Sequence, residues 1–112
     1  MTQHEQAVII WPVLALAARM QRFLTYSDLE GLVGIPRFGQ NNALHLIFLY
    51  CEKKRYPLLN SIVVNQETGF PGDEHPRKMK PEDFLIERAR VFAFNWSHKD
   101  KPTSDDFATL QK

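Results

Sequence analysis

The order of local structural signals that begins at Thr25 restricts the fold more than any other feature of this chain. Thr25 and Asp28 have the spacing of a helix capping box, in which each side chain accepts a hydrogen bond from the other residue's backbone N–H. Gly34 and Pro36 mark the end of the helix, because glycine adopts a left-handed conformation easily and proline cannot continue a helix. These signals predict a short helix over Tyr26–Val33 that ends in a tight turn.

A longer helix and a β-branched segment are predicted after this turn. Within the helix predicted for residues 41–54, the stretch 43–51 is apolar at every position except His45, so the helix should be buried on more than one face. Residues 59–65 are predicted to form a strand because they contain three consecutive β-branched side chains, and Gly69 suits the turn of a hairpin. The order helix, turn, helix and β-hairpin is the plan of a winged helix.

Helices are also predicted on both sides of this segment. The first runs from Ala7 or Pro12 to Gln21, because proline is tolerated in a first helical turn and apolar residues follow at helical spacing. A later helix begins at Pro81, followed by two acidic residues, and continues to about Asn95. The predicted fold class is α+β: a winged helix-turn-helix of three helices and a β-hairpin wing, with an added C-terminal helix.

The sequence predicts a single domain over residues 1–97. A chain of 112 residues with 44% hydrophobic side chains can bury a core without a disulfide or a structural metal. Residues 98–112 are mostly polar and are predicted to form a tail with at most one short helical turn, at 104–110. Whether this tail is ordered stays open at this point.

Cysteine content, apolar runs and charge limit the classes of function. Cys51 is the single cysteine and cannot form an internal disulfide bond, which favours a reducing compartment such as the cytoplasm. The apolar run 7–18 contains Pro12 and is too short to span a bilayer, so we expect a core helix and no membrane partner. The formal net charge is +1, so binding to nucleic acid would depend on a local patch of basic residues.

Two short segments resemble a known DNA-binding domain. The sequence FLTYSDLE at 23–30, followed by Gly34-Ile35-Pro36, is similar to the start of the DNA-binding domain of alkylguanine-DNA alkyltransferases and alkyltransferase-like proteins. Pro57, residues 63–65 and Gly69 are similar to the second half of that domain. The resemblance covers about half of the chain and implies the topology of a winged helix.

The residues that carry the chemistry of that family are absent. Leu58-Leu59-Asn60 follows Pro57 where the family has a reactive Cys-His-Arg, and the tryptophan of the alkyltransferase-like proteins is missing there too. Asn41-Asn42-Ala43 stands where the family inserts an arginine into the base stack. The resemblance therefore implies neither alkyl transfer nor nucleotide flipping for this chain.

The predicted DNA-contacting surface lies around the second motif helix. Asparagine, glutamine and histidine side chains at its N-terminal turns can bond to base edges, and asparagine and glutamine suit adenine. Basic side chains before and after the helix, and a polar side chain on the wing, could contact phosphates. The predicted contact residues are Arg37, Gln40, Asn41, Asn42, His45, Lys53, Lys54, Arg55 and Gln66. The alternative is that the asparagines only cap the helix and the basic triplet only solvates its end.

The other reactive side chains are expected to be structural. Cys51 and His45 lie six residues apart on one helix, roughly 120° around its axis, so they do not form a catalytic pair. Asp73, Glu74 and His75 are adjacent, but no second cluster with the spacing of metal ligands completes a site. We therefore expect neither an enzyme nor a metal or other cofactor.

Aromatic residues near the C-terminal end suggest a second kind of function. Phe92, Phe94 and Trp96 exceed what one apolar face requires, so they could contact a protein partner or a second copy of the chain. The first functional hypothesis is a non-catalytic winged-helix DNA-binding protein that could act as a regulator. The alternative is a small protein-interaction module, such as an inhibitor, an immunity protein or a phage anti-defence protein, that binds and blocks a protein partner.

Overall fold

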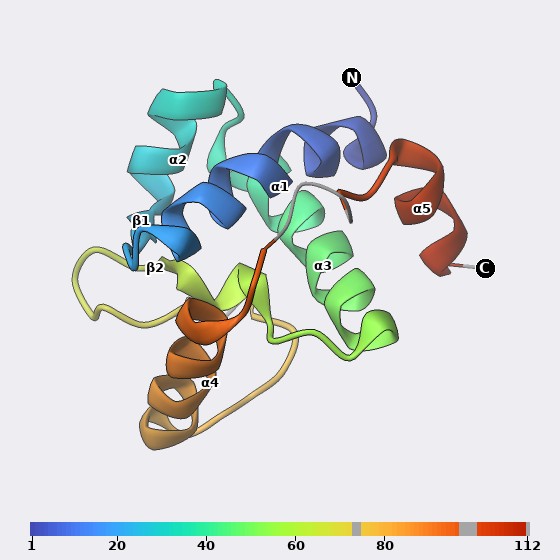
Figure 1. Cartoon of the computed structure of the whole chain (residues 1–112). Helices are drawn as coiled ribbons and strands as arrows, with labels where there is room; N and C mark the ends of the chain where they lie inside the picture. The colour runs from blue at the N-terminus through green and yellow to red at the C-terminus, as the bar shows by residue number, and fades with distance from the viewer. Residues whose placement is uncertain (73–74, 97–100, 112) are drawn as a thin grey trace.

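The structure is a computed structural model that describes residues 1–72, 75–96 and 101–111. These residues form an α+β fold with five α-helices and a two-stranded parallel sheet (Figure 1). The elements in chain order are α1 (Gln3–Arg19), β1 (Leu24–Thr25), α2 (Tyr26–Val33), α3 (Arg37–Lys54), the 3₁₀-helix η1 (Leu59–Ile62), β2 (Val63–Val64), α4 (Pro81–Ala93), α5 (Ser104–Ala108) and the 3₁₀-helix η3 (Thr109–Gln111).

The bounds predicted for α2 are confirmed. The backbone N–H of Asp28 donates to Thr25 Oγ1 at 3.0 Å, and the N–H of Thr25 donates to the Asp28 carboxylate at 3.0 Å. Gly34 ends the helix in the left-handed region, at φ 72°. Local capping chemistry therefore defines this helix without help from distant residues.

Two other helices begin earlier than predicted. Thr2 and Glu5 form a second capping box, so α1 starts at Gln3 and carries Pro12 in its interior. The predicted start at Ala7 or Pro12 is wrong because the Thr2 cap is stronger than the proline signal. Helix α3 starts at Arg37 rather than at Asn41, and Pro36 stands at its N-cap without a side-chain hydrogen bond. Its predicted end at Lys54 is confirmed.

The predicted strand over 59–65 is shorter in the structure and has a different partner. Residues Leu59–Ile62 form η1, and β2 pairs in parallel with β1, with Leu24 opposite Val63 and Thr25 opposite Val64. Residues 65–70 close a loop through a hydrogen bond from the Asn65 N–H to the Phe70 carbonyl oxygen at 2.8 Å. Among the described residues, no antiparallel return strand follows β2, so the predicted β-hairpin is replaced by this loop.

The core lies where α1 crosses α3 (Figure 1). Trp11 of α1 packs edge-on against Tyr50 of α3, with ring centroids 5.4 Å apart, and against Trp96, at 5.8 Å. Phe107 of α5 is fully buried and its ring lies 5.6 Å from that of Tyr50. The described part of the C-terminal segment is therefore ordered against the core.

Gln40 connects α2 to α3 from the interior of the protein. Its side chain is 0% exposed, and its Nε2 donates to the Tyr26 carbonyl oxygen at 3.0 Å and to the Ile35 carbonyl oxygen at 2.8 Å. The amide thus satisfies two buried backbone acceptors at the corner between the helices. Gln40 belongs to the interior, so its predicted role as a base-reading residue is wrong.

Replacing this amide tests its structural role. We expect Gln40→Ala to lower the free energy of unfolding by about 2–4 kcal/mol, because it removes two hydrogen bonds and leaves buried carbonyl groups without donors. Asn42→Ala, at a half-buried position two residues along, should change it by less than about 0.5 kcal/mol. Urea unfolding followed by circular dichroism measures both; equal effects would contradict the role assigned to Gln40.

Candidate nucleic-acid interface

Helix α3 exposes one narrow stripe of side chains. Phe38 is 82% exposed, His45 is exposed, and Asn41 and Asn42 are half-buried beside them. These positions recur at intervals of three or four residues, so they lie on the same face of the helix. The remaining faces are buried in the core by Ala43, Leu44, Leu46, Ile47, Phe48, Tyr50 and Cys51. The stripe is therefore the surface that the first half of α3 can offer to a partner.

Arg37 lies at the start of this stripe and is held over an aromatic ring. Its guanidinium carbon lies 4.3 Å from the centroid of the Tyr26 ring, in the geometry of a cation–π contact. The contact joins the first turn of α3 to the first turn of α2. An exposed cation is thereby positioned at the N-terminal end of α3, where the helix dipole is also positive.

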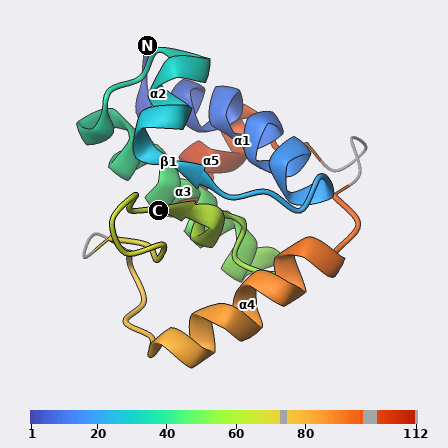
Figure 2. The same ribbon diagram turned by 90° about the vertical axis from the view of Figure 1, so that its left-hand side faces the viewer.

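A small polar cavity opens beside the stripe. Asn41 and His45 of α3 face Asn60 of η1 and His75 across it, and Tyr26 closes one side. The cavity has a volume of about 20 Å³, which is room for one water molecule. Because residues of α3 and His75 line the same cavity, the first turns of α3 adjoin the segment that follows β2. Figure 2 shows this segment and the first turns of α3 along one side of the molecule.

His75 is fixed by hydrogen bonds on both ring nitrogens. Its Nε2 lies 3.2 Å from Asn60 Nδ2, and its Nδ1 lies 2.8 Å from the Arg77 carbonyl oxygen. With the proton on Nδ1, this nitrogen donates to the carbonyl oxygen and Nε2 accepts from Asn60; with the proton on Nε2, Nδ1 instead accepts from the Arg77 N–H, 3.1 Å away. Burial lowers the pKa of His75 below its usual value, because the charged imidazolium would lose its hydration.

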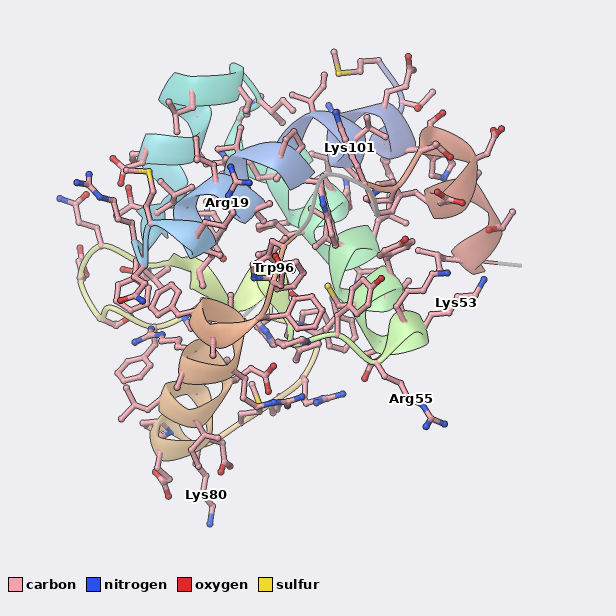
Figure 3. All side chains as sticks on the ribbon, viewed as in Figure 1. Arg19, Lys53, Arg55, Lys80, Trp96 and Lys101 are labelled. Carbon is pink, nitrogen blue, oxygen red and sulfur yellow. The ribbon has the colours of Figure 1, made fainter. Side chains whose placement is uncertain are left out.

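The basic triplet lies at the other end of α3. Lys53 and Lys54 are in its last turn and Arg55 follows in a left-handed conformation, at φ 60°. Lys53 is twelve positions after Asn41, which corresponds to roughly 18 Å along the helix axis. Figure 3 shows Lys53 and Arg55 extending outward from that end. Gln66 is exposed in the loop after β2, so the predicted contact residues occupy three separate places.

The aromatic residues predicted to contact a partner face inward. Trp96 is 4% exposed, and its Nε1 donates to the Val91 carbonyl oxygen at 2.7 Å. Phe94 is half-buried, with its ring 4.5 Å from Trp96 and 5.1 Å from Tyr56. Phe92 is half-buried and its ring lies 5.3 Å from that of Phe23. Trp96 is therefore part of the core rather than of an interaction surface.

Sequence reasoning missed three residues of this region. Phe38 lies between the two predicted motif helices and has no predicted role, although a lone aromatic residue among polar neighbours is itself a sign of exposure or function. Tyr26 and Asn60 were assigned only to a helix and a strand. Asn60 is 4% exposed and its Oδ1 has no hydrogen-bond partner in the described structure. A polar residue inside an apolar run was the available signal for it.

Cys51 lies in the interior of the core. Cys51 is fully buried, and desolvation raises the pKa of its thiol to about 12. In the described part of the chain, no three His, Cys, Asp or Glu side chains are placed to hold a metal ion. Asp73 and Glu74 lie outside the described residues. In that same part, no helix has the length and apolar character that crossing a membrane requires.

Comparison of the chain with protein-family models, with curated proteins and with solved structures found no match. The resemblance to the DNA-binding domain of alkyltransferases therefore stays a prediction.

The burial of Cys51 predicts its chemical behaviour. We expect the native thiol to react with a disulfide reagent on the order of a hundredfold more slowly than the thiol of the urea-unfolded chain. At about pH 9 the thiol of the unfolded chain should be largely ionised, whereas only about one native thiol in a thousand should be, so labelling of the native protein should stay far slower. Rapid labelling of the native protein would contradict a buried, structural cysteine.

The lowered pKa of His75 predicts a pH dependence of stability. Between its native pKa and the usual value of 6.5, the unfolded chain binds more protons than the native protein. The free energy of unfolding should therefore fall as the pH drops below 6.5, and this contribution should stop falling below the native pKa. Urea unfolding between about pH 7 and 5 should show a smaller loss for His75→Gln than for the wild type. Equal losses would exclude His75 as the cause.

Proposed function

We propose that this protein binds duplex DNA without catalysis, through the exposed stripe of α3. The observation that carries the proposal is the composition of that stripe in its first half: Asn41, Asn42 and His45 are the polar side chains that a buried helix leaves accessible. Amide side chains can form paired hydrogen bonds with the edge of adenine in the major groove. An α-helix presented by its N-terminal turns is a common reader of that groove.

The surroundings of the stripe support contacts with the DNA backbone. Arg37 lies at one end, and Lys78 is exposed in the segment that follows His75. Gln66 is exposed in the loop after β2, where a wing would contact phosphates. Phe38 projects beside Arg37 and provides an apolar surface of the kind that can pack against a sugar or a base.

The modest number of basic residues near the stripe sets the expected strength of binding. The net charge is +1, so the overall electrostatic attraction to DNA is weak. Each phosphate contact contributes about 0.9 to the slope of log K against log salt concentration. Few contacts therefore mean a shallow slope and binding that is strongest at low salt.

Fluorescence anisotropy with a random duplex at low salt tests the proposal. We expect measurable binding, and Arg37→Ala should reduce the salt slope by about one because it removes one phosphate contact. Changing Lys53, Lys54 and Arg55 together to alanine should also weaken binding if the duplex follows the full length of α3. Combining Asn41→Ala with Asn42→Ala should reduce discrimination between sequences more than it reduces binding to random DNA.

Lys101→Ala provides the matched control, because Lys101 is exposed and lies beside Trp11, Leu16 and Arg19 of α1, in a group that includes none of the predicted DNA-contacting residues. It should leave both the affinity and the salt slope unchanged. The absence of binding at low salt, or an equal effect of Lys101→Ala and Arg37→Ala, would contradict the proposal.

A protein-interaction module is the second candidate function. The observation that favours it is apolar exposure on α4, where Leu85 is 55% and Ile86 62% exposed. The same titration separates the two functions, since a module that binds only protein gives no anisotropy change with duplex DNA.

A further inference from the structure

Helix α4 carries its charged and apolar side chains on unexpected sides. Glu87 and Arg88 face the interior and are 6% and 7% exposed, whereas Leu85 and Ile86 face solvent. The helical spacing of Leu85, Ala89, Phe92 and Trp96 predicts one apolar stripe. Leu85 and Ala89 are nevertheless exposed, while Glu87 and Arg88 lie inside.

Hydrogen bonds explain why the charged side is buried. Glu87 Oε2 accepts a hydrogen bond from the Leu58 N–H at 2.7 Å, in a buried environment. Arg88 donates to the Gly69 carbonyl oxygen, and its guanidinium carbon lies 4.7 Å from the centroid of the Phe70 ring. These contacts tie α4 to the segments on either side of β2 and determine which face of the helix points outward.

The outward side of α4, which we call the outer face, consists of Glu82, Leu85, Ile86, Ala89, Arg90 and Ala93, all of them exposed. Figure 2 shows α4 at the edge of the molecule, and no other described element covers this side. Phe84 and Val91 are buried on the inward side of α4 together with Glu87 and Arg88, so Leu85 and Ile86 form a second apolar surface on a helix that already meets the core. The exposed fraction of Ile86, 62%, therefore indicates a surface that is covered in another state of the protein.

We propose that the outer face of α4 binds the outer face of a second copy in an antiparallel, two-fold symmetric contact. Glu82, Ile86 and Arg90 are spaced by four residues and form one ridge along the helix. If the two-fold axis passes at Ile86, Glu82 of each copy lies opposite Arg90 of the other. The ridge is thus complementary to itself when it is reversed, as a two-fold contact requires.

The charges on α4 favour a second copy of the chain as the partner, and they favour the antiparallel orientation. A parallel arrangement would place Glu82 against Glu82 and Arg90 against Arg90, which is repulsive, and would also align the helix dipoles. Arg90 already pairs with Glu87 in its own chain, with Nη1 and Oε1 3.0 Å apart, yet its side chain is 57% exposed. A guanidinium has five N–H donors, so Arg90 can bind a second carboxylate without releasing the first.

The neighbouring ridge provides the shape for close packing. Leu85, Ala89 and Ala93 are also spaced by four residues, and the two small alanines make a shallow groove beside Ile86. With the axis at Ile86, the two Ile86 side chains lie alongside each other, each at the edge of that groove in the other copy. Helix α4 is 13 residues long, so the contact is smaller than a standard stable interface, and we expect a dissociation constant in the micromolar range. Self-association through α4 does not require that the protein bind DNA.

Sedimentation velocity of the full chain, from low micromolar to near-millimolar concentrations, tests the contact. We expect a monomer–dimer equilibrium whose dissociation constant rises by more than about tenfold in Ile86→Lys. The matched control is Leu32→Lys, because Leu32 is equally exposed, at 63%, but lies on α2. This control should leave the equilibrium unchanged.

Charge reversal tests the orientation in variants that keep Ile86. Glu82→Arg and Arg90→Glu should each weaken the dimer, since each places like charges together, and the double variant should restore it. A monomer at every concentration would overturn the proposal, as would a dimer insensitive to Ile86→Lys or a double variant no stronger than either single change. Capture of a different protein by α4 of a monomeric chain would also overturn it.

Discussion

Burial of α3 on most of its circumference is the constraint on which the rest of the structure depends. Leu46, Ile47 and Cys51 are fully buried, so α1, α2 and η1 are arranged around this helix rather than beside it. A central helix of this kind can offer a partner only its ends and one narrow stripe. The accessible chemistry of the chain is therefore concentrated on the few polar positions that the core does not occupy.

Buried polar groups determine how the surrounding elements are oriented. The hydrophobic effect brings helices together but is not directional, so it does not specify which face of a helix turns inward. Gln40 supplies that information at the corner between α2 and α3, and Glu87 supplies it for α4. In each case a side chain bonds to a backbone group that would otherwise be buried without a partner. Removing the side chain lowers the free energy of unfolding by more than the net stabilisation that a typical hydrogen bond provides, because the backbone group is left unsatisfied. The two surfaces proposed for function thus follow from two interior hydrogen-bonding residues.

Local signals predicted the elements that depend only on neighbouring residues. The Thr25–Asp28 box and Gly34 gave the bounds of α2, because a cap acts within one turn of helix. The early start of α3 has no such signal, since Pro36 caps the helix without a side-chain hydrogen bond. The pairing of Val63 with Leu24 was not predictable either, because strand pairing joins residues that are far apart in sequence.

The kinds of side chain at the candidate site could be predicted from the sequence, but not which individual residues belong to the site. Asn41, Asn42 and His45 could be identified because they interrupt or precede an apolar run, yet Gln40 looked the same in sequence and is interior. Likewise, the periodicity of α4 indicates two apolar sides without saying which one meets the core. That choice is made by the Leu58 N–H, which lies 29 residues before Glu87. The apolar periodicity of one helix carries no information about a hydrogen-bonding partner that is so distant in sequence.

The two proposed surfaces would strengthen each other. A single copy has few cations near its α3 stripe, so one copy alone should hold DNA weakly. Joining two copies through α4 would make the second contact with DNA intramolecular, and the gain would come from effective concentration rather than from any new side chain. The gain exists only if both stripes can reach one duplex, because linkage contributes nothing when geometry forbids simultaneous contact. Weak self-association and weak DNA binding would then combine into a DNA-binding curve that is steeper in protein concentration than either equilibrium by itself. The α3 stripe would determine the sequence preference, and the α4 contact would determine the range of protein concentration over which DNA is bound.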